Sequence, residues 1–219
     1  MERSSVPGPT VCCAAASSRE RPPSTSRTYP AGSDRNTQRE RQPFMTTQDR
    51  TTVLLLTGAP GVGKTEVSRR LVGRLPGRVA LIDLDAIAAI HPWRADDTLF
   101  DLMSGNLTAL LPAYLSWGAD YIVVAGVVVP GMVYDRLHGL FTDERLQWRI
   151  YGLRAGPTAL AERIRRDTKY QDGEARMADS GLDSLVGAIP GVIQIDTDGL
   201  TLAGVVNRIT RHEQEFVRP

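Results

Sequence analysis

Apolar and polar positions alternate in a regular way from about Thr51 to the C-terminus. Five short apolar segments have the length and β-branched content of buried strands, residues 53–56, 78–83, 121–129, 147–153 and 191–195. Between them, apolar residues recur every three or four positions, as on one face of a helix. Strands that alternate with helices predict an α/β fold with a parallel sheet covered on both faces.

Residues 1–50 show neither period and are rich in Ser, Arg, Pro, Thr and Gln. Such a segment buries too little apolar surface to offset the entropy of ordering, so we expect a disordered tail followed by one domain over 51–219. A transit peptide and a start assigned too early, with Met45 as the true N-terminus, are the alternatives. Both cysteines, Cys12 and Cys13, lie in this tail, which fits a reducing cytoplasm.

The charge of the chain is nearly balanced, with a formal net charge of +1. A domain near neutrality has no electrostatic footprint for long nucleic acid or for an anionic membrane. No apolar stretch of the sequence has the eighteen or so residues needed to span a bilayer. We therefore expect a small-molecule partner, no membrane and no long nucleic acid, and a monomer or homodimer.

The most specific motif follows the first apolar run and reads Gly-x-x-x-x-Gly-Lys-Thr between a predicted strand and a predicted helix. In this P-loop arrangement, glycines let backbone N–H groups turn toward phosphate oxygens, and the helix adds its positive dipole end. Lys64 is placed to reach the β- and γ-phosphates, and the Thr65 hydroxyl to ligate Mg²⁺. ATP and Mg²⁺ are therefore the expected cofactors. The predicted nucleotide contacts are Gly58, Ala59, Pro60, Gly61, Val62, Gly63, Lys64, Thr65 and Glu66.

Asp83 and Asp85 follow the second apolar run, one residue apart. If the strand period of two continues, both carboxylates face the phosphates at the carboxyl end of the sheet. One acid near Mg²⁺ and one near an attacking hydroxyl suit phosphoryl transfer. The alternative is that an aspartate at a strand end only caps the next helix.

The third apolar run has no carboxylate at its end, which reads Ala125-Gly126-Val127. Many P-loop NTPases place a Walker-B acid there. Asp83 is therefore the best candidate for the Mg²⁺ carboxylate. The missing acid also counts against an AAA-type ATPase motor.

Two further regions carry candidate contacts. Trp93 and Arg94 lie in a loop before a predicted helix and are candidates for contacts with a second substrate. The alternative is that Trp93 covers the edge of the core and Arg94 is an ordinary surface residue. After Gly156-Pro157, a predicted helix carries Arg163 and Arg166 on one face. With the polar segment 170–184 they predict a flap that brings guanidinium groups over the phosphates; the alternative is a solvated helix and an ordinary loop.

With these residues in place, the chain from about Thr51 onward resembles the small-molecule kinases of the nucleoside-monophosphate-kinase-like P-loop group. It looks most like the shikimate, gluconate and chloramphenicol phosphotransferase branch. The resemblance implies a three-layer P-loop NTPase fold with a five-stranded parallel sheet and a helical flap, or lid. It also implies roles in the transfer for Lys64, Asp85, Arg163 and Arg166.

The resemblance further assigns the surroundings of the two substrates. Asp85 becomes the base beside the accepting hydroxyl, and Asp83 the carboxylate on the Mg²⁺ side. Asp198 falls in the adenine-side loop after the fifth strand. The predicted acceptor contacts are Asp85, Trp93, Arg94 and Gly126.

Two departures from the group bear on the acceptor. Shikimate kinases carry three glycines after the third strand, where only Gly126 stands here, and nucleotide kinases carry several arginines, where only Arg94 and Arg136 are candidates. A neutral, partly apolar hydroxyl compound is therefore favoured over a monophosphate. The sequence predicts an ATP-dependent phosphotransferase acting on a small-molecule hydroxyl. The alternatives are a nucleotide or 5′-hydroxyl nucleic-acid kinase, and a non-catalytic ATP-binding regulator or ATPase.

Overall fold

The computed structural model describes residues 50–166 and 181–217. Residues 1–49 of the predicted tail and residues 170–180 of the predicted flap lie outside the described residues. Among the described residues, no helix combines the length and the apolar character needed to cross a membrane.

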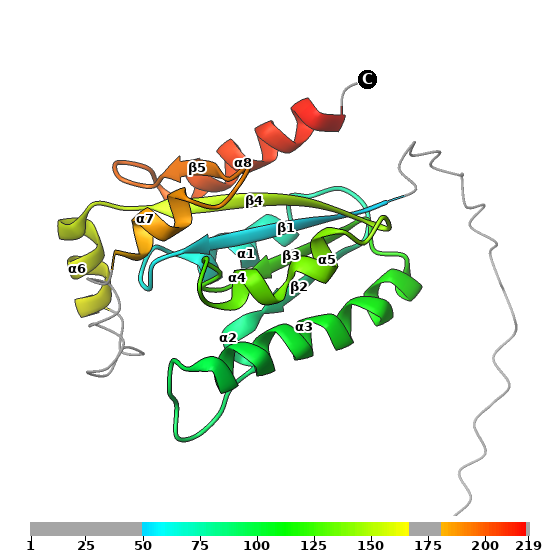
Figure 1. The fold of residues 1–219 in the computed structure, drawn as a ribbon. Coiled ribbons are helices and arrows are strands. Elements are labelled where there is room, and N and C mark those ends of the chain that lie inside the picture. The colour runs from blue at the N-terminus through cyan, green and yellow to red at the C-terminus, as the bar shows by residue number, and fades with distance from the viewer. Residues whose placement is uncertain (1–49, 167–180, 218–219) are drawn as a thin grey trace, which may run out of the picture. The chain divides into compact units, whose positions relative to one another are not determined.

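Five parallel strands form one sheet in the order β2-β3-β1-β4-β5 (Figure 1). Their bounds are β1 Thr51–Gly58, β2 Val79–Asp83, β3 Tyr121–Ala125, β4 Leu146–Arg154 and β5 Ile193–Asp196. The helices are α1 Lys64–Val72, α2 Leu84–Ile87, α3 Asp97–Trp117, α4 Val133–Arg136, α5 His138–Phe141, α6 Pro157–Arg166, α7 Leu182–Gly187 and α8 Leu202–Val217. β1 lies at the centre, so the loop that follows it opens in the middle of the sheet.

Side chains of β1 alternate between two apolar layers. Leu54 and Leu56 pack in the cluster that contains residues of α1 and α8, whereas Val53 and Leu55 pack in the cluster that contains residues of α3. All four are fully buried, as expected for a parallel strand covered on both faces. The structure thus confirms the three-layer α/β architecture with a five-stranded parallel sheet (Figure 1).

The third predicted strand is shorter than its apolar run. β3 ends at Ala125, although Val128 and Val129 are still fully buried. Beyond the strand, Thr57 of β1 takes over the pairing: its hydroxyl donates to the Val128 carbonyl at 2.8 Å and accepts the Val128 N–H at 3.0 Å. The prediction of a strand over 121–129 was therefore wrong at its end, because burial of the backbone continues without a ladder.

The helices differ from the expectation in three places. α2 begins at Leu84, between the two aspartates, although the strand period was expected to continue to Asp85. α4 and α5, of four residues each, were not predicted. α7 begins at Leu182, so residues 182–184 are helical and do not belong to a flap.

Candidate active site

Residues 58–63 form a tight loop between β1 and α1. Gly58 has φ +149°, and a Cβ there would collide with the Leu153 carbonyl oxygen of the neighbouring strand. A Cβ at Gly61 would lie 2.7 Å from Cγ1 of Ile164, so the loop packs directly against α6. α1 begins after Gly63, which has no side chain to cap the first turn. The N–H groups of that turn therefore suit an anion.

Lys64 holds its positive charge beneath this loop. Its side chain is only 8% exposed, and Nζ donates to the carbonyl oxygens of Gly58 and Ala59 at 2.9 and 3.0 Å. Burial lowers the pKa of Lys64 to about 8, while the negative charges of Asp85 and Asp83 act in the opposite direction. The ammonium group is thus poorly hydrated and lies near two carboxylates.

Asp83 makes contacts in two directions. It is the last residue of β2 and the N-cap of α2, and its Oδ1 accepts the N–H of Asp85 at 3.1 Å. Its Oδ2 accepts the hydroxyl of Thr65 at 3.4 Å. The capping alternative is therefore correct for Asp83, but the second oxygen still faces the residue expected to ligate Mg²⁺.

Asp85 reaches the site by a different route from the one the strand period predicted. The strand ends before it, and Asp85 lies in the first turn of α2. Both aspartates nevertheless line one cavity of about 750 Å³ with Lys64 and Thr65. We call this cavity the chamber.

The described residues fit a bound Mg²⁺-nucleotide. Mg²⁺ is usually held by one or two carboxylates, water and substrate phosphates, without a dedicated protein cage. Thr65 and Asp83 supply two oxygens next to the buried cation of Lys64. Within the described ranges, no group of three or more His, Cys, Asp or Glu side chains is arranged to hold a metal by itself.

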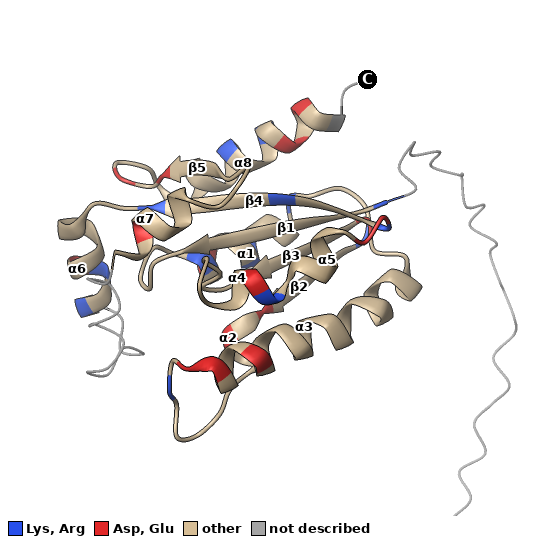
Figure 2. Cartoon of the chain, viewed as in Figure 1, with Lys and Arg blue, Asp and Glu red and all other residues tan. Residues whose placement is uncertain are grey.

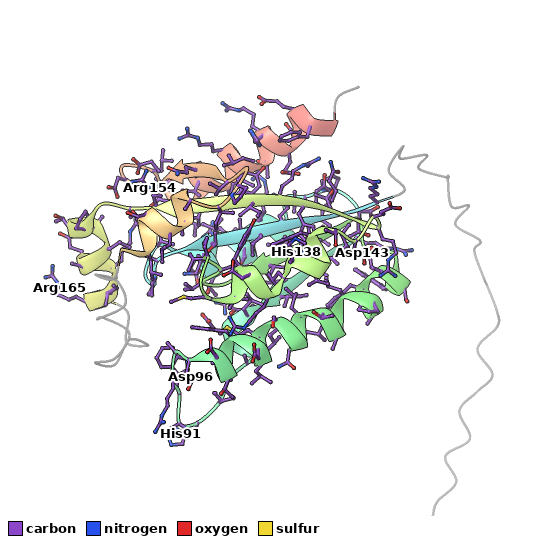
Figure 3. The ribbon with its side chains drawn as sticks, in the orientation of Figure 1. His91, Asp96, His138, Asp143, Arg154 and Arg165 are labelled. Carbon is purple, nitrogen blue, oxygen red and sulfur yellow. The ribbon has the colours of Figure 1, made fainter. Side chains whose placement is uncertain are left out.

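The part of the chamber away from the P-loop is mostly apolar. Its walls include Leu99, Phe100, Met103, Val127 and Met132. Trp93 also lines the chamber and is 44% exposed, whereas Arg94 and Gly126 are not among the lining residues. His91 lies on the loop between α2 and α3 that borders the chamber (Figure 3).

Gly126 has a packing role beside the chamber. A Cβ at this position would lie 2.7 Å from Cδ1 and 2.8 Å from Cβ of Leu84. Leu84 is fully buried and stands between the two aspartates. The missing side chain at residue 126 therefore lets α2 pack close to the sheet and helps to position Asp83 and Asp85.

Arg163 of α6 contacts the P-loop and the loop that follows β5. Its guanidinium group donates to the Val62 carbonyl at 3.3 Å and to the Thr197 hydroxyl at 3.0 Å. Asp198, in the same loop after β5, accepts the N–H of Gly156 at 2.7 Å. These contacts tie the P-loop, the start of α6 and the predicted adenine-side loop together. They do not place Arg163 among the residues that line the chamber.

The remaining predicted nucleotide contacts lie in the P-loop, in α1 and in α6. Ala59, Pro60 and Val62 belong to the P-loop, and Glu66 in α1 pairs with Arg69 at 3.2 Å. Arg166 ends α6, and its side chain lies outside the described set.

Sequence reasoning missed several residues that shape the site. Thr57 and Thr197 hold the chain on either side of the P-loop, and Phe100 and Met132 line the chamber. A threonine directly after the first apolar run was the available signal for Thr57. The others carry no such signal, because only the folded chain brings them to the site.

The five-stranded parallel sheet and the glycine loop before α1 define a P-loop NTPase fold, as the resemblance implied. The chain belongs to a family described as AAA domain, whose model matches residues 53–183. No curated protein matches it.

Solved structures with the same fold include a tunicamycin resistance protein and a sugar kinase. The tunicamycin resistance protein of Deinococcus radiodurans is 23% identical, with a TM-score of 0.55 over 75% of this chain and 96% of that one. The sugar kinase of Janibacter sp. HTCC2649 is 14% identical, with a TM-score of 0.59 over 78% and 99%. At these identities the similarity defines the fold.

Proposed function

We propose that the protein is a phosphotransferase that moves the γ-phosphoryl group of ATP to a hydroxyl group of a small molecule. The observation that carries this proposal is the position of Asp85, which lines the same chamber as Lys64 and Thr65. A protein that only holds a nucleotide has no need for a second carboxylate there. The sugar kinase among the similar structures also supports a small-molecule acceptor.

Each side chain has a proposed role in the transfer. Lys64 places positive charge at the phosphates, and Asp85 accepts the proton of the attacking hydroxyl. Thr65 and Asp83 would hold Mg²⁺, which neutralises charge on the phosphate oxygens when it is bound. Arg163 and Arg166 are proposed to add positive charge from α6.

The proposed acceptor is an uncharged alcohol with an apolar body. The walls formed by Leu99, Phe100 and Met103 favour apolar surface, and Trp93 offers an aromatic face. Arg136, considered for an acidic acceptor, is engaged by two carboxylates. A contact between Arg94 and the acceptor stays a prediction. The cytoplasmic location and the monomeric or homodimeric state also stay predictions.

Asp85→Asn tests the proposed base. We expect turnover to fall by at least about 10²-fold, because base assistance contributes roughly 10²–10⁴ in rate. Affinity for ATP should stay nearly unchanged, since Asp85 is not part of the P-loop. Steady-state kinetics and calorimetric ATP titration measure the two effects separately. Undiminished turnover would remove Asp85 from the mechanism.

Asp143→Asn is the matched control. Asp143 lies in the turn before β4 (Figure 3), where it accepts the N–H of Arg145 at 3.0 Å, and it does not line the chamber. The same change of carboxylate to amide there should leave turnover within about twofold, as for a surface site away from the chemistry.

ADP release separates the proposed function from its alternatives. It is measured with ATP alone and then with hydroxyl metabolites, antibiotics and nucleoside monophosphates. Stimulation by one neutral alcohol supports the proposal, and stimulation by a monophosphate favours a nucleotide kinase. ADP release that no acceptor changes favours an ATPase, and its complete absence favours a regulator.

A further inference from the structure

The side chain of Arg136 connects two walls of the chamber. Its Nη2 donates to Oδ1 of Asp97 at 2.7 Å and its Nε donates to Oδ1 of Asp101 at 2.5 Å. Its Nη1 donates to the carbonyl oxygen of Met132 at 2.7 Å. The guanidinium carbon also lies 5.5 Å from the centre of the Phe100 ring. All three nitrogens of the group are thus engaged.

These contacts come from separate parts of the chain that meet at the chamber. Asp97, Phe100 and Asp101 belong to the first turns of α3, and Met132 directly precedes α4. Phe100 and Met132 both line the chamber. Figure 2 shows the acidic start of α3 and the short helix α4 with its basic residue. The same guanidinium group therefore contacts one lining residue on each wall.

The exposure of these charged side chains indicates that Arg136 orients its neighbours more than it stabilises the fold. The side chain of Arg136 is 23% exposed, whereas those of Asp97 and Asp101 are 86% and 69% exposed. Exposed ion pairs contribute little to the stability of a fold. The planar fork of arginine, however, fixes the direction of several partners at once, which a lysine cannot do.

We propose that Arg136 is a positioning residue for the acceptor. This inference rests on the proposed function. Arg136 holds Phe100 and Met132 at a fixed separation and so sets the width of the chamber, without touching the acceptor itself. Because the guanidinium group of Arg136 already pairs with Asp97 and Asp101, its charge holds the chamber wall together and does not bind an acidic substrate.

Arg136→Met and Arg136→Lys test the proposal in the full chain, with Arg145→Met as a matched control. Arg145 also makes two hydrogen bonds to one aspartate, Asp143, but far from the chamber lining. With an acceptor found by ADP release, Arg136→Met should raise the KM of that acceptor by about tenfold, as expected for a misplaced binding wall. The KM of ATP should stay within about twofold. Arg136→Lys should fall between wild type and Arg136→Met.

Hydrogen exchange of the backbone provides a second measurement that needs no acceptor. In Arg136→Met, exchange should become faster in residues 97–103 and 129–136, whereas Arg145→Met should leave both segments unchanged. Unchanged exchange in Arg136→Met, or an equal rise in acceptor KM in Arg145→Met, overturns the proposal. If no compound stimulates ADP release, the proposed function fails, and the exchange rates still decide whether Arg136 holds the walls together.

Discussion

Lys64 combines two properties that are rarely found together in a lysine. Its ammonium group is nearly excluded from water, and its hydrogen bonds go to the Gly58 and Ala59 carbonyls of its own loop. Two carboxylates, Asp83 and Asp85, compensate only part of the cost of burial, so the pKa falls to about 8. The group therefore titrates close to physiological pH.

The pH dependence of nucleotide binding follows from this shift. Phosphate charges favour the protonated lysine, so ATP affinity should fall as the pH rises above about 8. Lys64→Arg stays protonated and should lose this fall. Calorimetric titrations at pH 7, 8 and 9 measure the affinities. Parallel titrations of wild type in buffers of different ionisation enthalpy should show proton uptake above pH 8, and no uptake would contradict the assignment.

The lowered pKa of Lys64 also makes the stability of the folded chain depend on pH in a defined direction. The lysine titrates near 10.5 in the unfolded chain and near 8 in the folded one, so the unfolded state binds more protons between these values. The contribution of Lys64 to stability therefore increases as the pH rises from 8 to 10.5. It is lost as the pH falls through 8.

At the scale of elements, the position of α2 decides where the acid pair lies. This four-residue helix begins directly after the cap Asp83 and packs Leu84 against Gly126. It is tied to α3 by Asn106, whose Nδ2 donates to the Ile87 carbonyl at 2.7 Å. A helix this short has no stability of its own. Its place is therefore set by what packs around it.

Gly126→Ala should displace this helix. The new methyl group would lie 2.7 Å from the Leu84 side chain, and overpacking of this kind costs about 1–3 kcal/mol. Turnover should fall as well, because Leu84 stands between the two aspartates. Urea unfolding measures the stability, and kinetics the turnover.

Gly105→Ala is the control for this substitution. Gly105 is exposed within α3, and a Cβ there meets nothing within 4 Å. The same added methyl group should stabilise the protein by about 0.5–1 kcal/mol, through helix propensity. Equal effects of the two substitutions would contradict the packing role of Gly126.

At the scale of the whole molecule, a buried polar cluster joins α8 to the sheet. Arg149 of β4 donates to Glu213 of α8, and the side chains are 6% and 3% exposed. Tyr151 also donates to Glu213 and contacts His212 at 3.0 Å. Burial and the bond to Glu213 raise the pKa of Tyr151, so its hydroxyl stays a donor. None of these residues lines the chamber.

Glu213→Ala should therefore change stability, and not the acceptor site. It leaves the charge of Arg149 buried without its carboxylate, which costs about 3–5 kcal/mol in comparable pairs. Glu66→Ala removes the exposed partner of Arg69 and should cost less than about 1 kcal/mol. Chemical unfolding of both variants tests the difference. A loss in Glu213→Ala no larger than in Glu66→Ala would show that the buried pair contributes little.

The sheet and the nucleotide loop could be predicted from the sequence because both have local signatures. The strands are apolar runs, and the glycine spacing of residues 58–65 is a backbone requirement written in order along the chain. The end of β3 could not be predicted, since a buried strand and a buried irregular segment have the same composition. α4 and α5 are too short to show a period.

The chamber was predictable only on its P-loop side. Asp83 and Asp85 line the chamber together with Lys64, but the argument from strand period was wrong because α2 begins between them. The opposite wall depends on Phe100 and Met132, which are distant in the sequence and ordinary in type. Only the tertiary packing of the folded chain brings Phe100 and Met132 to the same chamber.

Thr57 gives the site one rigid side. Its two hydrogen bonds to Val128 fasten the strand that ends in Gly58 to the segment that leads to Met132. The P-loop and the segment that borders the chamber at Met132 are therefore joined into one rigid unit.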